Sequence, residues 1–113
     1  MHADVRRLQD VVVLDLSGKL TAGLGDQILR ESLDELLAEG WKKILVNLSQ
    51  VTFMDSAGVG ELVGGLRTSQ RLGAELRLLN TSERVHSTLS IARLLPVFRI
   101  HQSEREALEA FGG

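Results

Sequence analysis

The chain of 113 residues contains no cysteine, which excludes disulfides, thiol catalysis and metal sites built on cysteine ligands. Its three histidines, His2, His86 and His101, are widely scattered and match no metal-ligand spacing, so no metal or other cofactor is expected. No apolar run approaches the ~20 residues that cross a bilayer, and the N-terminus has no signal-peptide pattern. We therefore expect a cytoplasmic protein without membrane insertion.

Neither sign of charge is in excess. The 13 Lys and Arg residues stand against 15 Asp and Glu residues, giving a formal net charge of −2 at pH 7. The basic pairs Arg6-Arg7 and Lys42-Lys43 are isolated and form no stripe along a predicted element. Because nucleic-acid binding depends on clustered basic side chains, no nucleic-acid partner is expected.

Apolar periodicity predicts alternating strands and helices. The predicted strands are a hairpin of residues 4–8 and 11–17 with Gly18 ending its second arm, then 44–48, 76–79 and an edge strand at 97–100. The predicted helices start at the N-cap Asp26, at Ser56, at Thr81 or Ser82, and after a capping box at 103–106. This order predicts one α/β domain over residues 1–113, with a mixed, mostly parallel sheet of four to five strands and about four helices.

The second predicted helix, which follows Asp55-Ser56, is unusually rich in glycine. Ser and Asp are preferred N-caps, so the pair has a purely structural interpretation. The helix after it contains Gly58, Gly60, Gly64 and Gly65, although each interior glycine costs about 1 kcal/mol relative to alanine. Ala57, Gly60, Gly64 and Thr68 share one small-residue face, whereas Val59, Leu62, Val63 and Leu66 form the expected core stripe. The small-residue face is therefore predicted to meet a partner.

These residues resemble a known family. The segment VNLSQVTFMDSAGVGELVGGLRTSQRLGAELRLLN is similar to the centre of a STAS domain, the fold of bacterial anti-sigma factor antagonists. VVVLDLSGKLTAG resembles the N-terminal strand and turn of that family, and LLPVFRIHQSEREALEAF resembles its closing strand and final helix. The resemblance implies that Ser56 is the serine phosphorylated by a partner that is both a kinase and an anti-sigma factor.

The same resemblance implies a cycle. The unphosphorylated chain binds the anti-sigma factor with serine kinase activity, a sigma factor is freed, phosphorylation of Ser56 ends binding, and a serine phosphatase resets the chain. Two alternatives share the fold: a STAS subunit of a stress-signalling scaffold, or one of a lipid-transporting ABC complex. A weak nucleotide-binding or hydrolysing protein is a third.

Catalysis by the chain itself is not expected. Nucleophilic serine catalysis requires a base to accept the proton, and no histidine lies in the Asp55-Ser56 motif. The motif is not the G-x-S-x-G elbow, and the chain lacks a G-x-x-x-x-G-K-[ST] phosphate loop. Asp55 has two interpretations, a helix cap or a group that orients the serine hydroxyl and engages the nucleotide of the kinase.

The partner-binding surface is predicted at the C-terminal ends of two neighbouring strands, where α/β sheets place their sites. The loop 21–25 is expected to lie beside Ser56, with Leu24 either docking a partner or plugging the core. Phe53 is expected in the core, and Met54 is assigned to the surface beside Ser56, with a core position as its alternative. The predicted partner-binding residues are Thr21, Gly23, Leu24, Met54, Asp55, Ser56, Ala57, Gly58, Gly60 and Gly64.

Overall fold

The computed structural model describes residues 1–112, which form five strands, four α-helices and one 3₁₀ helix. In chain order these are β1 (His2–Leu8), β2 (Val11–Leu20), α1 (Gly25–Ala38), β3 (Lys43–Met54), α2 (Ser56–Arg71), β4 (Glu75–Leu79), α3 (Glu83–Ile91), η1 (Leu95–Val97), β5 (Ile100–His101) and α4 (Glu104–Gly112).

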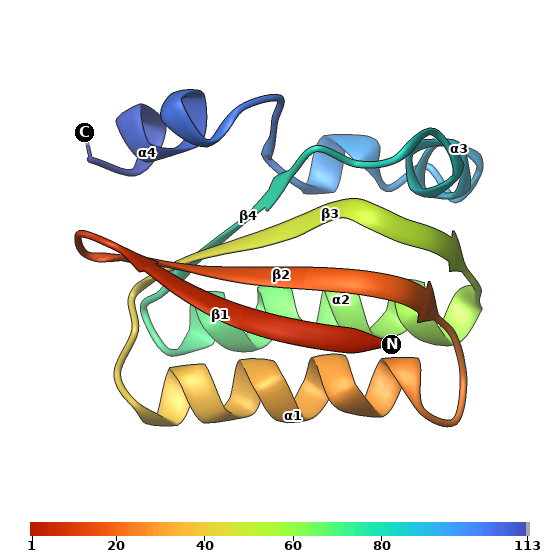
Figure 1. Cartoon of the computed structure of the whole chain (residues 1–113), viewed down its shortest axis with the longest axis horizontal. Coiled ribbons are helices and arrows are strands. Elements are labelled where there is room, and N and C mark those ends of the chain that lie inside the picture. Colours follow the sequence, from red (N-terminus) through yellow and green to blue (C-terminus); the bar gives the residue numbers. More distant parts are fainter. Residues whose placement is uncertain (113) are drawn as a thin grey trace.

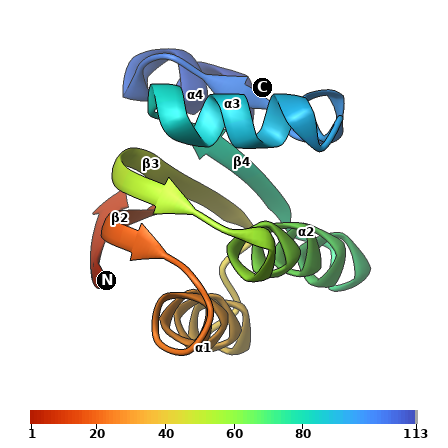
Figure 2. The same cartoon turned by 90° about the vertical axis from the view of Figure 1, so that its right-hand side faces the viewer.

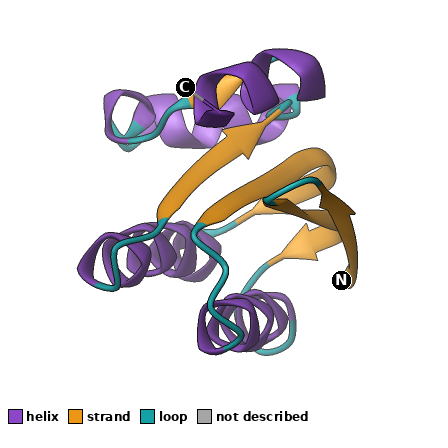
Figure 3. Cartoon of the chain, turned by 90° about the vertical axis from the view of Figure 1, so that its left-hand side faces the viewer, coloured by secondary structure: helices purple, strands orange, loops and turns teal. Residues whose placement is uncertain are grey.

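The five strands form one sheet in the order β1-β2-β3-β4-β5. β1 pairs with β2 antiparallel, and every other neighbouring pair is parallel. Helices α1 and α2 cover one face of the sheet, and α3 and α4 lie on the other (Figure 1; Figure 3). The predicted α/β class, with a mixed and mostly parallel sheet, is confirmed. No helix within residues 1–112 is long and apolar enough to cross a bilayer.

The sheet is buried on both faces over its centre, which explains why its strands are nearly continuous apolar runs. On the α1 and α2 side, Leu14 and Ile44 pack with Leu29, Leu33 and Leu62 of the helices. A smaller cluster joins the opposite face to α4, and its buried members are Val11, Val13, Leu45, Leu79, Ala107 and Phe111. Successive side chains of a strand point to opposite faces of the sheet, so neighbouring residues of β2 belong alternately to the two clusters.

Two predicted boundaries near the first βα loop are wrong. Gly18 adopts a positive φ of 101° but does not end β2, which continues to Leu20. Helix α1 begins at Gly25 with Leu24 as its N-cap residue and without a side-chain cap, so Asp26 lies inside the first turn instead of capping it. The cause of the first error is β3, which also runs further than predicted, to Met54, and keeps pairing with β2 up to Leu20.

The C-terminal third also differs from the prediction in detail. β5 contains only Ile100 and His101, because the 3₁₀ helix around Pro96 occupies the start of the predicted strand. Ala92, which the apolar spacing Val85, Leu89, Ala92 places on the inward side of this helix, is instead its exposed C-cap. The hydroxyl of Ser82 caps α3 as predicted, accepting a hydrogen bond from Val85 N–H at 3.4 Å. At α4 only half of the capping box forms: Glu106 N–H donates to Ser103 Oγ at 3.1 Å.

Two glycines let helices α1 and α2 begin against the backbone end of β2. A Cβ atom on Gly58 would lie 2.2 Å from the carbonyl oxygen of Leu20. A Cβ atom on Gly25 would lie 2.3 Å from the carbonyl oxygen of Lys19. Since no side chain fits in either gap, both helix N-termini depend on glycine for their close approach to this strand.

Gly58 and Gly60 provide a matched pair of substitutions on one helix. Gly58→Ala should destabilise the fold by about 1–3 kcal/mol, because the methyl group would overlap a backbone oxygen that cannot rotate away. Gly60→Ala should stabilise it by up to about 1 kcal/mol, since its Cβ would meet open space and alanine favours the helix. Thermal denaturation measures both changes, and a melting temperature that moves in the same direction for the two variants would contradict the packing at Gly58.

Candidate functional site at the ends of β2 and β3

The side chain of Asp55 links the two loops that leave β2 and β3. Its Oδ1 accepts a hydrogen bond from Gly58 N–H at 3.0 Å, which caps α2. Its Oδ2 accepts a hydrogen bond from Ala22 N–H, also at 3.0 Å, in the loop between β2 and α1. Asp55 N–H in turn donates to Leu20 O at 3.4 Å. One residue therefore fixes the distance between the first and second βα loops.

These hydrogen bonds also set the charge of Asp55. Backbone N–H donors from Ala22 and Gly58 favour the ionised carboxylate and lower the pKa of Asp55 below its ordinary value of 3.8. Within residues 1–112 no Lys, Arg or His side chain forms an ion pair with it. The loop junction thus carries a full negative charge at neutral pH that only backbone dipoles compensate.

Ser56 is the first residue of α2 and is exposed. The structural interpretation of Ser56 as the N-cap is wrong, because the N-cap is Asp55. Among the described residues the Ser56 side chain makes no hydrogen bond, so its hydroxyl is free to meet solvent or another molecule. Of the two interpretations of Asp55, the structure shows the cap directly.

The loop 21–25 lies beside the start of α2, as predicted. Figure 2 looks at this end of the sheet, where the chain leaves β2 for α1 next to the point where it leaves β3 for α2. Asp26 N–H donates to Thr21 O at 3.0 Å, so the loop closes on itself and presents its tip outward. Ala22, Gly23 and Leu24 are exposed, with 63% of Leu24 accessible, and the alternative of Leu24 as a core plug is wrong.

Phe53 and Met54 have the reverse of their predicted positions. Met54 is buried in the core with Leu20, its register partner on β2, whereas Phe53 is exposed. The pairing of β2 with β3 shifts register between Asp15 and Ser17 and again between Gly18 and Lys19. These shifts break the simple alternation that the first part of β3 follows. Gly58 is buried as well, so it and Met54 support the surface from below and cannot touch a partner directly.

The small-residue face of α2 points away from the core. A Cβ atom added to Gly60 or Gly64 would meet no atom within 4 Å, and both residues are exposed. Gly65 differs, because its Cβ would lie 2.5 Å from Leu33 Cδ1 of α1. Leu62 and Leu66 are buried as predicted, while Val59 and Val63 are half-buried against the core. Next to Gly64 a groove of about 210 Å³ separates α2 from α1.

Phe53 is the surface residue that the sequence analysis missed. Its ring lies 5.6 Å from the guanidinium carbon of Arg84, a contact of cation–π type between β3 and α3. No sequence signal identified it, since the run VTFM gives no clear period. We define the end surface as Phe53, Asp55, Ser56 and Ala57 together with the half-buried Thr21 and the exposed Gly23 and Leu24 of the loop, adjoined by Gly60 and Gly64.

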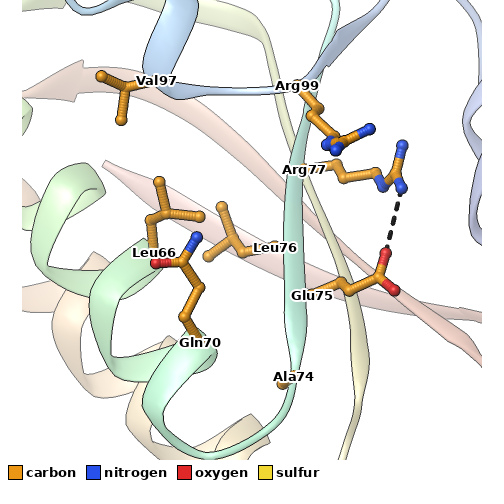
Figure 4. Close-up of a pocket in the computed structure, with 8 residues that line it drawn as sticks. All are labelled: Leu66, Gln70, Ala74, Glu75, Leu76, Arg77, Val97 and Arg99. Atoms are coloured by element: carbon orange, nitrogen blue, oxygen red, sulfur yellow. Dashed lines mark hydrogen bonds and ion pairs between the residues drawn. The ribbon is translucent and has the colours of Figure 1, made fainter.

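A second hollow, of about 300 Å³, lies away from the end surface between α2 and β4 (Figure 4). Leu66, Gln70 and Leu76 line one part of it, and Arg77 and Arg99 line another. Arg77 Nη2 donates to Glu75 at 3.1 Å, and its guanidinium lies 4.9 Å from the ring of Phe111. None of the predicted site residues borders this hollow. Residues 1–112 also contain no cluster of three or more His, Asp or Glu side chains that could hold a metal ion.

Comparison with known proteins assigns the fold and the loop motif to one family. The sequence model of the STAS domain family matches residues 2–107 of the chain. The chain belongs to the STAS domain family. The resemblance noted in the sequence is therefore confirmed over nearly the whole chain, including the Asp55-Ser56 loop and both flanking strands.

Relatives of this STAS domain carry names from one regulatory class. A candidate anti-sigma factor antagonist of Thermotoga neapolitana is 33% identical over 106 residues, which are 94% of this chain and 94% of that protein. The anti-sigma F factor antagonist of Paenibacillus polymyxa is 23% identical over 108 residues, or 96% of this chain and 92% of that protein. The solved structure of the anti-sigma factor antagonist SpoIIAA in its unphosphorylated form superimposes with a TM-score of 0.83 at 25% identity, covering 99% of this chain and 97% of that one.

The pKa of Asp55 gives a test of the loop junction in this STAS domain. A carboxylate whose pKa is lower in the folded state stabilises the fold above 3.8, its ordinary pKa, and this stabilisation is lost as the pH falls through the lowered value. Asp55→Ala should therefore lower the melting temperature most at neutral pH, and the difference from the wild type should shrink at about pH 3. Asp55→Asn keeps one acceptor oxygen without the charge, so at neutral pH its melting temperature should lie between that of Asp55→Ala and that of the wild type. A pH-independent difference would contradict the hydrogen-bonded carboxylate.

Proposed function

We propose that this STAS domain is an anti-sigma factor antagonist whose binding is switched by phosphorylation of Ser56. The observation that carries the proposal is the exposed hydroxyl of Ser56, without a hydrogen bond in residues 1–112, beside the Asp55 carboxylate, whose charge only backbone N–H groups compensate. The relatives named as anti-sigma factor antagonists support the binding role. The SpoIIAA structure described as unphosphorylated supports the idea that such a protein exists in two phosphorylation states.

The physical basis of the switch is charge on the end surface. Phosphorylation would add about −1.5 to −2 charge to Ser56 at pH 7, directly next to the negative charge of Asp55. The N-terminal dipole of α2 tolerates an added anion, so the fold itself should persist. A partner surface fitted to the neutral hydroxyl would instead have to bury this concentrated charge, and desolvation and repulsion both oppose that. Binding is then lost while the domain stays folded.

The proposed partner contacts follow from exposure. Leu24 and Phe53 offer exposed apolar area on the end surface, and Gly60 and Gly64 leave α2 open to close approach by another backbone. The partner is an anti-sigma factor with serine kinase activity, which is displaced once it has phosphorylated Ser56, and a serine phosphatase restores the neutral form. The proposed function is one of binding, in which Asp55 holds the surface in place through the backbone N–H groups that engage both of its oxygens.

Substitutions at Ser56 test the charge argument. Ser56→Ala should keep binding, since the surface stays neutral, and should change stability by less than the roughly 1 kcal/mol of a lost cap, because Asp55 is the cap. Ser56→Asp should bind at least about tenfold more weakly, which corresponds to about 1.4 kcal/mol. Both variants should stay folded, because aspartate is favourable in the first turn of a helix. Titration against the purified cognate anti-sigma factor with nucleotide present measures both affinities.

The matched control is Ser90→Asp, which adds the same charge at an exposed serine of α3. It should bind like the wild type. Equal affinity of the Ser56→Ala and Ser56→Asp variants would remove the switch. Phosphate incorporation that persists in Ser56→Ala would move the acceptor to another hydroxyl, and the nearest in sequence are the exposed Thr52 and the half-buried Ser49.

Leu24 tests whether the first βα loop belongs to the partner surface. Leu24→Asp places a charge on the exposed loop tip and should weaken partner binding while leaving the melting temperature unchanged or slightly higher, since aspartate is a preferred N-cap at this position of α1. Ile91→Asp is the control, because Ile91 is 81% exposed on α3. If both variants bind normally, the loop lies outside the interface; if both bind weakly, the effect is one of overall charge.

A further inference from the structure

Strand β1 forms one edge of the sheet and has an open outer side. Its seven residues pair with β2 in continuous register from His2 with Ser17 to Leu8 with Val11. In the described part of the chain no element pairs with the opposite side of β1, which runs along the front of the sheet in Figure 1. An unpaired strand of this length is a template for another strand.

The turn after β1 determines which backbone groups face outward. Only Gln9 and Asp10 separate Leu8 from Val11, and in such a two-residue hairpin the flanking residues bond to each other. Leu8, Arg6 and Asp4 therefore direct their N–H and C=O groups toward β2. Because the direction alternates along a strand, the backbone groups of Ala3, Val5 and Arg7 point away from the sheet.

Several of the usual protections of an edge strand are absent from β1. Natural edges carry proline, charged side chains (above all lysine), bulges or a covering element, and of these β1 has only the charges of Asp4, Arg6 and Arg7 in the described part of the chain. The sequence HADVRRL contains neither proline nor lysine, and its pairing with β2 has no register shift. Val5, at the middle of the strand, is 50% exposed. The edge is therefore regular, and its central side chain is apolar.

We propose that β1 pairs antiparallel with β1 of a second copy of this chain, with Val5 opposite Val5 on the twofold axis. This register places Asp4 opposite Arg6 of the second copy, twice by symmetry. Moving the axis to Asp4 would set two carboxylates against each other, and moving it to Arg6 would set two guanidinium groups against each other. Because opposite charges across a strand pair stabilise and like charges destabilise, the charges of β1 select the Val5 register.

The side chains of β1 are available for this pairing. Asp4 is exposed and has only the exposed His2 as its partner, at 3.1 Å. Arg6 uses Nε and Nη2 for Asp15 and Glu104, so within residues 1–112 its Nη1 makes no hydrogen bond. On the other face, Arg7 lies at a groove of about 290 Å³ with Glu35 and Glu39 of α1. In the proposed register Arg7 stands opposite Ala3 of the second copy, next to the acidic groove of that copy.

Cysteine cross-linking tests the register directly, because the natural chain contains no cysteine. Val5→Cys should form a disulfide-linked dimer under mild oxidation, since residues directly opposite in a hydrogen-bonded antiparallel pair have Cα atoms about 5.5 Å apart, within disulfide range. Val97→Cys is the control: the same residue type, 46% exposed, but outside β1. It should cross-link only at the background rate. Equal cross-linking of the two variants would overturn the proposal.

Two further variants separate edge pairing from loss of the fold. Val5→Pro removes an N–H that points away from β2, which an edge strand tolerates, so the melting temperature should change little while sedimentation shows only monomer. Asp4→Arg in the Val5→Cys background should reduce disulfide formation about tenfold, because it sets like charges opposite each other twice. The proposal fails if the wild type sediments as a monomer at every concentration, or if a dimer persists in Val5→Pro.

Discussion

The Asp55 carboxylate holds together the end of this domain where β2 and β3 lead into α1 and α2. With one oxygen it caps α2 through Gly58 N–H, and with the other it binds Ala22 N–H in the preceding βα loop. Neither loop has a large apolar side chain buried at its tip that could fix it by packing. Because the carboxylate is bound by backbone groups from both loops, the relative position of Leu24 and Ser56 depends on this one side chain. The same constraint keeps the carboxylate ionised, so the geometry and the negative charge of the end surface have one origin.

Close backbone packing makes this arrangement possible. Gly25 and Gly58 allow the first turns of α1 and α2 to approach the carbonyl oxygens of Lys19 and Leu20, where no Cβ atom fits. Met54 fills the space beneath Gly58, opposite Leu20 in the β2–β3 register. Because Asp55 accepts the capping hydrogen bond from Gly58 N–H, the exposed Ser56 hydroxyl is not needed as the cap of this helix. A side chain with no structural role at a rigid position can be modified without loss of the fold.

The sequence was sufficient to predict the α/β class, the order of the elements and the position of the loop 21–25 beside Ser56, because apolar periodicity and the rule for strand ends determine them. It was not sufficient for Phe53 and Met54. Their orientation depends on where β3 gains residues relative to β2, and register shifts arise from pairing between strands, which a single strand's pattern does not encode. The sequence also left open which residue of the pair caps α2. Ser56 and Asp55 have comparable intrinsic preference for the N-cap, and the contact of Asp55 with Ala22, 33 residues earlier, lies outside what the local sequence encodes.

The two proposed interactions, docking of a partner at the end surface and pairing of β1 with a second copy, use different parts of the sheet. Ser56 lies where β3 leads into α2, at one end of the sheet, whereas Val5 lies halfway along the edge strand β1. Charges exposed to solvent are screened beyond about 8 Å at physiological ionic strength, so a phosphate on Ser56 acts on what docks at the end surface. The Arg6–Asp15–Glu104 ion pairs, which join β1 to β2 and α4, lie on the opposite face of the sheet from α1 and α2. Phosphorylation at Ser56 would thus change binding at the end surface while leaving pairing at β1 intact.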